Sequence, residues 1–288
     1  MRSWTILQVL RWTTARFEGR GNTSARLDAE LLAARAFGCS RVELYTRHDQ
    51  PLGEGELASY RALVQRRLAG EPVAYILGHK EFWSLPLQVD ARVLIPRPDS
   101  ETLVELGLKL LAEQAVARVA DIGTGSGALA LAFKKERQGD EVVAVDISAA
   151  ALAVAAANSE RLGLPVTFLQ GDLVAPLGGQ FDLMVSNPPY IASGEIDGLP
   201  SEVRSEPRLA LDGGPDGLAL VRRLAHDASA VLEPRGWLAI EIGASQAGAA
   251  TALLREAGYR EVGTRRDLGG VERVVFGRRG GVADEPVA

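Results

Sequence analysis

The fold is decided by an eight-residue stretch, Ala120-Asp121-Ile122-Gly123-Thr124-Gly125-Ser126-Gly127, which ends one apolar run and opens an Ala- and Leu-rich segment. Glycine accepts positive φ angles that other residues avoid, and three glycines stand here at alternate positions. Without side chains, the backbone can also come within contact distance of a ligand. A strand, a glycine-rich turn and a helix in this order predict an α/β fold with a ligand at the turn.

From about residue 97 onward, apolar runs alternate with Ala- and Leu-rich segments. We expect strands at 117–122, 141–146, 166–170, 181–186, 237–242 and 273–277. We expect helices at 127–137, 148–162, 216–232 and 245–257. This alternation is typical of βαβ units, in which a mostly parallel sheet carries helices on both faces.

The first quarter of the chain follows a different pattern. Residues 3–70 carry apolar residues at three-to-four spacing, which indicates helices, with Ser24 as an expected cap and a break at 51–53. Residues 73–96 suggest a short hairpin. We therefore expect four parts: a small helical domain over 1–72, a β-hairpin linker over 73–96, an α/β domain over 97–280 and a loose tail over 281–288.

The composition restricts the classes of function. The chain has 288 residues, a single cysteine (Cys39) and three histidines without metal-ligand spacing, so we expect neither an internal disulfide nor a metal. No stretch approaches the ~20 apolar residues of a membrane span, and the N-terminus lacks the apolar core of a signal peptide. The expected location is the cytoplasm, with no membrane partner.

The charge is unevenly distributed. Residues 1–80 contain 12 Lys and Arg against 8 Asp and Glu, a net charge of +4, whereas the whole chain carries −5. The remainder therefore carries −9, which argues against a protein that coats nucleic acid. The basic N-terminal face is either a solvated helical surface or a docking surface for an acidic protein or for RNA phosphates.

Four polar residues close four successive predicted strands, namely Asp121, Asp146, Asp172 and Asn187. In a parallel sheet these strand ends lie along one edge, which is where open α/β sheets bind ligands. Asp146 can accept hydrogen bonds from both hydroxyls of a ribose. Asp172 can accept from an adenine amino group, and Leu173 can cover the face of the ring.

The glycine loop alone fits two cofactors. Gly123-x-Gly125-x-x-Ala128 satisfies the dinucleotide fingerprint, and Asp146 stands near the distance expected for a ribose contact. However, Asp121 lies two residues before the first glycine. A carboxylate there would repel a pyrophosphate but suits a ligand with a cationic amino group and a sulfonium. The loop therefore favours S-adenosyl-L-methionine over NAD.

The stretch Asn187-Pro188-Pro189-Tyr190 directly follows the apolar run 181–186. Two consecutive prolines cannot donate backbone hydrogen bonds, so the strand must stop and the backbone is stiff. The Asn187 side-chain oxygen and the Pro188 carbonyl can then accept the two hydrogens of a planar NH2 group, and the Tyr190 ring can stack on its plane. The alternative is a proline-rich turn with an aromatic plug.

With these motifs in place, the chain resembles the HemK/PrmC family, which methylates the side-chain amide nitrogen of a glutamine in peptide chain release factors. The resemblance covers most of the chain. Beside the NPPY motif it rests on three segments: 94–101 (LIPRPDSE), 70–78 (GEPxxYIxG) and 206–218 (EPxxALxGGxDGL). The chain departs from the family pattern in two places. Asp99-Ser100-Glu101 stands where Glu-Thr-Glu is usual, which is a chemically mild change. Leu173 occupies an often aromatic position, so we expect weaker adenine stacking there.

The resemblance implies a Rossmann-like S-adenosylmethionine-dependent methyltransferase domain and a helical domain that binds the substrate. The implied substrate is a class 1 release factor, a protein of translation termination. It implies methylation at N5 of the glutamine in a Gly-Gly-Gln motif. The expected catalytic residues are Asn187, Pro188 and Tyr190, and Pro189 joins them in binding the substrate. The expected cofactor-binding residues are Asp121, Gly123, Thr124, Gly125, Ser126, Gly127, Asp146, Asp172, Leu173 and Asn187.

Other functions remain open from the residues alone. An adenine-N6 or cytosine-N4 nucleic-acid methyltransferase would present the same amino group to Asn187, but it needs a basic groove, and the net charge of −9 argues against one. A non-catalytic binding module or an NAD-dependent oxidoreductase would not need both the intact glycine loop and the NPPY motif. The chain's own Gly178-Gly179-Gln180 is expected to be a turn between strands.

Overall fold

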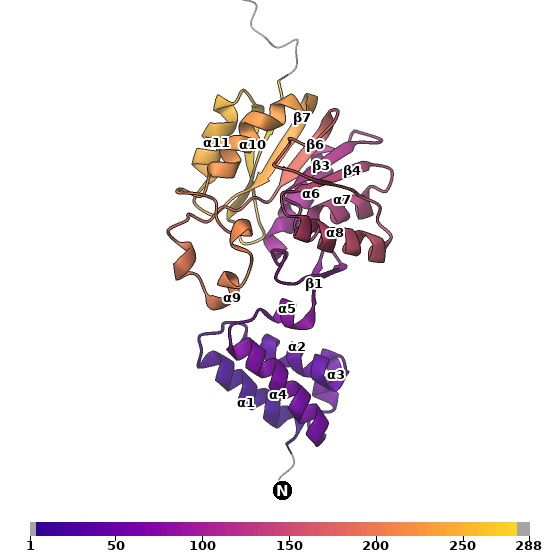
Figure 1. The fold of residues 1–288 in the computed structure, drawn as a ribbon, viewed down its shortest axis with the longest axis vertical. Helices are drawn as coiled ribbons and strands as arrows, with labels where there is room; N and C mark the ends of the chain where they lie inside the picture. The colour runs from indigo at the N-terminus through magenta and orange to yellow at the C-terminus, as the bar shows by residue number, and fades with distance from the viewer. Residues whose placement is uncertain (1–3, 281–288) are drawn as a thin grey trace, which may run out of the picture. The chain divides into compact units, whose positions relative to one another are not determined.

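The computed structural model describes residues 4–280 as two compact units (Figure 1). One unit runs to His79 and also includes Pro200–Ser205, and the other comprises Lys80–Leu199 and the chain from Glu206 onwards. The loose tail expected at 281–288 lies outside the described residues. Within 4–280, no helix is both long and apolar enough to cross a membrane.

The first unit is helical. It contains α1 (Ile6–Glu18), α2 (Ala25–Phe37), α3 (Arg41–Thr46), α4 (Glu54–Leu68), α5 (Val73–Leu77) and, from the second segment, α9 (Ser201–Arg204). Thr5 and Ser40 begin α1 and α3 with capping boxes, in which the side chain bonds the third backbone N–H of the helix. Ser24 does precede α2, but its side chain makes no capping hydrogen bond.

Polar contacts connect Pro200–Ser205 to the N-terminal part of this unit. The Arg67 guanidinium donates to Asp28 at 2.8 Å and also pairs with Glu202. The Ser205 hydroxyl contacts the carbonyl of Gly70 at 3.4 Å. The helical unit is therefore built from two pieces of the chain that are more than a hundred residues apart.

The hairpin prediction over 73–96 was wrong in its first part. Val73–Leu77 forms the helix α5 because Pro72 starts it and Gly78, at φ +80°, ends it in the left-handed region. The hairpin itself comprises β1 (His79–Phe82) and β2 (Leu85–Gln88). Its two-residue turn places Trp83 and Ser84 at positive φ, without the glycine or asparagine that would have marked it.

The second unit contains a seven-stranded sheet in the order β5-β4-β3-β6-β7-β9-β8. The strands are β3 (Arg118–Ile122), β4 (Glu141–Asp146), β5 (Thr167–Gln170), β6 (Phe181–Ser186), β7 (Leu232–Glu241), β8 (Arg260–Arg266) and β9 (Glu272–Arg278). β3 to β7 pair in parallel, and β9 runs antiparallel to β7 and β8. Six strands were predicted. β8, which contains four charged residues among seven, has no apolar run and was missed.

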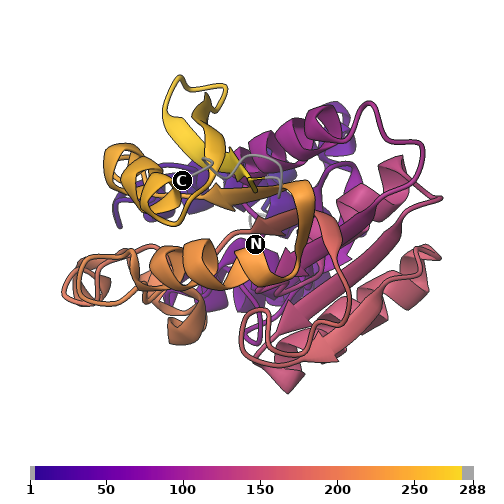
Figure 2. The same ribbon diagram turned by 90° about the horizontal axis from the view of Figure 1, so that it is seen from above.

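Helices cover both faces of this sheet, as the alternation predicted (Figure 2). They are α6 (Glu101–Leu110), α7 (Ala128–Glu136), α8 (Ala149–Leu162), α10 (Ala219–Asp227) and α11 (Ala247–Glu256). Short 3-10 turns occur at Pro98–Ser100, Ile196–Gly198, Arg208–Ala210 and Ala228–Ala230. The helix predicted over 216–232 is shorter than expected, because the chain already enters β7 at Leu232.

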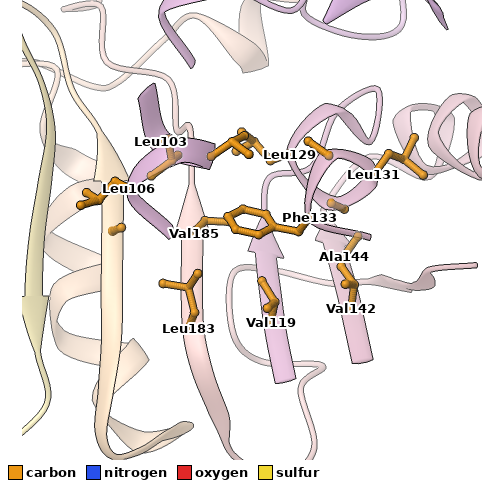
Figure 3. Packing of buried hydrophobic residues seen from close by; sticks show 14 of the residues in the cluster. Leu103, Leu106, Val119, Leu129, Leu131, Phe133, Val142, Ala144, Leu183 and Val185 are labelled. Atoms are coloured by element: carbon orange, nitrogen blue, oxygen red, sulfur yellow. The ribbon is translucent and has the colours of Figure 1, made fainter. Parts of the chain in front are cut away.

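Alternate side chains of the central strands pack on opposite faces. Val119 and Leu183 join α6 and α7 in one apolar cluster, whereas Ala120 and Met184 join α10 and α11 in the other. Figure 3 shows the first cluster, where the Phe133 ring of α7 lies over the strands. Burial on both faces explains why these strands read as continuous apolar runs in the sequence.

Gly107 in α6 allows the close approach of Phe133. A Cβ at this position would lie 2.5 Å from Phe133 Cζ and 2.9 Å from a methyl carbon of Leu183. We expect Gly107→Ala to lower the free energy of unfolding by ~1–3 kcal/mol, because overpacking outweighs the gain in helix propensity. Urea denaturation monitored by circular dichroism measures this change.

The matched control is Gly55→Ala in α4, where a Cβ meets nothing within 4 Å. This variant should be neutral or more stable. Equal stability of both variants would contradict the assigned packing of Gly107.

Candidate active site

A cavity of about 270 Å³ lies at the carboxyl ends of the parallel strands. Six of the predicted cofactor-binding residues line it, namely Gly123, Gly125, Asp146, Asp172, Leu173 and Asn187. Pro189 lines it as well. The sheet edge thus brings together residues that are far apart in the sequence.

The glycine loop between β3 and α7 forms one wall. Gly123 and Gly125 have φ angles of +73° and +56°, and a Cβ on either would project into open space. The N–H groups of Gly123 and Thr124 both donate to the carbonyl of Val145 on β4, at 2.8 and 3.0 Å. Gly127 has a different role, because a Cβ there would press on Ala155 at 3.2 Å. It lets α7 pack closely against α8.

Asp121 does not line the cavity, because its side chain is completely buried beneath the loop. Its Oδ2 accepts from the Thr124 hydroxyl at 2.6 Å and from the Ala130 N–H at 3.1 Å. Its Oδ1 is buried without a hydrogen-bond partner among the described residues. Burial raises the pKa of Asp121 to about 7. The structure therefore gives Asp121 a role in shaping the loop, and a direct cofactor contact stays a prediction.

Asp146 ends β4 with its carboxylate at the cavity. Oδ2 accepts from the Gly125 N–H and Oδ1 from the Ser148 N–H, both at 2.9 Å. These bonds fix the orientation of the carboxylate. Each oxygen keeps a further lone pair, so both can still accept from a pair of hydroxyls.

Asp172 and Leu173 lie on the opposite wall. The Asp172 carboxylate pairs with the guanidinium of Arg223 on α10 at 2.7 Å, and both side chains are about half exposed. Leu173 adopts a φ of +50°, which is unusual for a branched aliphatic residue. A ligand amino group at Asp172 would share the carboxylate with Arg223.

The Asn187–Tyr190 segment leaves β6 at the same edge. The Asn187 Nδ2 donates to the Ser100 hydroxyl oxygen at 3.0 Å. The Tyr190 carbonyl accepts from Gln246 Nε2 at 2.9 Å, and a Cβ on Gly217 would collide with the same carbonyl. Pro188 is buried. Two hydrogen bonds, one with Ser100 and one with Gln246, thus hold the segment from outside.

A second, smaller cavity of about 50 Å³ adjoins Asn187. It is lined by Thr124 and Ser126 of the glycine loop and by the apolar side chains of Phe82 and Leu94. Gly123, Gly125, Leu94 and Asn187 line both cavities. Asn187 therefore stands where the two spaces meet.

Four residues of this region were not assigned a role from the sequence. They are Ser100, Asn158, Glu241 and Gln246. Asn158 is buried, and its amide bonds both Gln88 of the hairpin and the carbonyl of Ser126 in the loop. Glu241 could have been suspected, because it is a carboxylate inside a predicted apolar strand. The other three make contacts between segments that no local pattern reveals.

No metal site accompanies these residues. Among residues 4–280, no group of three or more His, Cys, Asp or Glu side chains is arranged to hold a metal ion.

Comparison with known proteins gives a consistent result along the chain. Residues 8–78 match a family model described as the PrmC N-terminal domain, and residues 100–199 match one described as a methyltransferase small domain. A release factor glutamine methyltransferase of Geobacter sulfurreducens is 45% identical over 279 residues, which cover 96% of this chain and 98% of that protein. That of Bordetella pertussis is 48% identical, covering 88% of this chain and 94% of its own length.

Solved structures show the same fold at lower identity. A methyltransferase from Pyrococcus furiosus has a TM-score of 0.53 at 20% identity and covers 75% of this chain and 97% of its own. The hMettl16 catalytic domain, in complex with a 3′UTR hairpin, has a TM-score of 0.59 at 19% identity and covers 84% of this chain and 85% of its own. Both support the α/β methyltransferase fold.

The buried Asp121 carboxyl should make stability depend on pH. Its pKa is raised from 3.8 to about 7 in the folded protein, so the native state binds the proton more tightly than the unfolded state. The contribution of Asp121 to the free energy of unfolding is therefore complete below about pH 4. It is lost as pH rises to about 7, at up to ~1.4 kcal/mol per pH unit.

Asp121→Asn removes the ionisable group and keeps an oxygen that can accept from Thr124 and Ala130. The free energy of unfolding of both proteins is measured by urea denaturation between pH 5 and 8, without ligand. As pH rises, it should fall less steeply in the variant than in the wild type. The same slope in both would contradict the raised pKa.

Proposed function

Because this chain belongs to the family of release factor glutamine methyltransferases, we propose that it methylates the side-chain amide nitrogen (N5) of the glutamine in the Gly-Gly-Gln motif of class 1 release factors. The methyl donor is S-adenosyl-L-methionine. The observation that carries this proposal is the placement of Asn187 where the two cavities meet, beside the glycine loop.

The residues of the larger cavity fit this donor. Gly123 and Gly125 leave the loop backbone bare, and Asp146 presents two oriented oxygens to a ribose. Asp172 and Leu173 would hold the adenine, with Arg223 sharing the Asp172 carboxylate. When bound, the cofactor supplies a methyl group on a cationic sulfur. Thr124, Ser126 and Gly127 complete the loop that would surround its amino-acid end.

The protein must make a poor nucleophile reactive. An amide nitrogen donates its lone pair to the carbonyl, and the ~18–20 kcal/mol rotation barrier gives the scale of this delocalisation. Asn187 Oδ1 and the Pro188 carbonyl would accept from the two N–H groups of the glutamine, which raises electron density on nitrogen. Tyr190 would stack on the amide plane and align it for transfer, an effect for which ~7–11 kcal/mol is the upper range. The nitrogen gains a methyl group and releases one proton.

The helical unit offers a surface for the rest of the release factor. A groove of about 340 Å³ between α1 and α4 is lined by Trp4, Trp12 and Tyr60 and flanked by Arg16 and Arg61. Trp12 is 53% exposed, which is unusual for so large an apolar side chain. Aromatic and arginine side chains together are typical of binding hot spots. An apolar segment with acidic neighbours would complement this groove.

A nucleic-acid methyltransferase is not proposed. The similarity to an RNA-bound protein extends to the fold alone, at 19% identity. The near-full-length relatives at 43–48% identity carry the name of release factor glutamine methyltransferases. Since release factors act on ribosomes, the proposed location is the cytoplasm.

The proposal is tested by incubating a purified class 1 release factor with this protein and S-adenosyl-L-methionine, followed by peptide mass spectrometry. One added methyl group on the Gly-Gly-Gln glutamine is the expected result. An unmodified glutamine together with methylated adenine or cytosine in a parallel nucleic-acid reaction would overturn it.

Substitutions should separate chemistry from cofactor binding. We expect Asn187→Ala to lower kcat by about 10²–10³-fold, because the substrate amide loses an oriented acceptor. Binding of S-adenosyl-L-methionine, measured by calorimetry, should change much less. Asp146→Ala should show the reverse pattern, with weakened cofactor binding. Near-normal turnover of Asn187→Ala would refute the acceptor mechanism. Tyr190→Phe should lower kcat only slightly, because stacking needs the ring and not the hydroxyl.

The groove on the helical unit can be tested with two substrates. Trp12→Ala should raise KM for the intact release factor at least tenfold, since buried aromatic anchors commonly contribute 2 kcal/mol or more. Activity toward a short Gly-Gly-Gln peptide should not change. Val42→Ala, on α3 and 72% exposed outside the groove, is the matched control. Equal KM values for the two variants would exclude the groove as the docking surface.

A further inference from the structure

Asn187 is backed by two buried residues that the proposed reaction has not yet used, Ser100 and Glu241. Ser100 ends the 3-10 turn Pro98–Ser100 and is 4% exposed, and Glu241 ends β7 and is 1% exposed. The Ser100 oxygen accepts from Asn187 Nδ2 at 3.0 Å, and the nearby Ser100 hydroxyl lowers the pKa of the Glu241 carboxylate. Ser100 therefore interacts with the buried Glu241 and with the Asn187 amide that lines the cavities.

The direction of these bonds decides which end of the Asn187 amide faces the substrate. A hydroxyl has one proton, and an ionised carboxylate can only accept. When Glu241 is ionised, a Ser100 proton directed at it leaves a lone pair on the Ser100 oxygen for Asn187. Only the NH2 end of the amide can donate to that lone pair. The Oδ1 end is then turned away from Ser100.

We propose that Ser100 and Glu241 are positioning residues that hold the Asn187 amide in the one orientation in which Oδ1 can accept from the substrate nitrogen. This inference rests on the proposed function, because it assigns Oδ1 the role of acceptor for an N–H group. If the Asn187 amide were flipped, its NH2 group would face the N–H of the substrate amide, and two donors cannot form a hydrogen bond. The bond to Ser100 would be lost as well.

The environment of Glu241 supports this role. Glu206 is equally buried but pairs with Arg97 and accepts from the Ile95 N–H. Glu241 Oε2, in contrast, has no hydrogen-bond partner among residues 4–280. A buried carboxylate that is incompletely paired costs stability, which calls for a functional explanation.

The groups around Glu241 set its response to pH. Arg273 on β9 and Arg97 lower its pKa and Asp99 raises it, while Tyr190 lies close enough to be affected by its charge. Arg273 is itself paired with Asp99 and Asp267, at 3.3 and 3.2 Å. Burial is the largest influence and raises the pKa of Glu241 to about 7. Protonated Glu241 could donate to Ser100, which would free the Ser100 proton for Oδ1 and permit the flipped amide.

Kinetics with both substrates saturating test the proposal. We expect Ser100→Ala to lower kcat about five- to tenfold, with the KM for S-adenosyl-L-methionine unchanged. Ser100→Thr keeps the hydroxyl and should restore kcat. Glu241→Gln should remove the loss of kcat that the wild-type protein shows as pH falls below about 7. A Ser100→Ala variant with wild-type kcat would overturn the proposal.

A measurement without turnover keeps this inference separate from the proposed function. The chain has three asparagines (Asn22, Asn158 and Asn187), so ¹⁵N-asparagine labelling gives three side-chain amide signals, and Asn187→Ala identifies the one in question. This signal should shift in Ser100→Ala, and it should titrate near pH 7 in the wild type but not in Glu241→Gln.

Identical titration in wild type and Glu241→Gln would overturn the positioning role even if the enzyme is active. Conversely, absence of release-factor methylation by the wild type would refute the proposed function while leaving the observed amide orientation intact.

Discussion

The parallel pairing of β3 with β4 on one side and β6 on the other is the constraint on which the site depends. The registers Ile122↔Val145 and Ile122↔Ser186 align the three strand ends. The Ser186 hydroxyl donates to the Ile122 carbonyl at 2.7 Å, which ties two of these ends together. As a result the glycine loop, Asp146 and Asn187 leave the sheet side by side. A slip of one residue would turn these side chains to opposite faces.

Two buried carboxylates stand at this edge, and burial raises the pKa of each to about 7. Asp121 lies under the glycine loop, and Glu241 lies behind Asn187 through Ser100. Each has one oxygen without a hydrogen-bond partner among the described residues. Both therefore place an ionisable group beside a ligand-binding segment without contacting the cavity directly. Burying a carboxylate at such a position lowers the stability of the fold, and its remaining hydrogen bonds support the ligand-binding segment.

The sequence predicted the architecture well, because strands buried on both faces produce continuous apolar runs. It also predicted which strand ends carry polar groups, since the parallel topology makes them neighbours. It could not reveal β8, an edge strand rich in charged residues, or α5, where Pro72 and Gly78 bound a helical turn of five apolar residues. It did not reveal that the Asp121 carboxylate holds the loop from below, through bonds from Thr124 and Ala130. Contacts such as Ser100 with Asn187 depend on the fold as a whole.

The helical unit is discontinuous, since Pro200–Ser205 belongs to it. A gene fragment that stops at codon 79 would leave Arg67 without Glu202 and Gly70 without Ser205. In the intact chain, nine residues separate Tyr190 from Pro200, so the backbone that carries the NPPY motif continues into the helical unit. The two units are therefore joined by three covalent crossings, and neither can be exchanged as a single cassette between related genes.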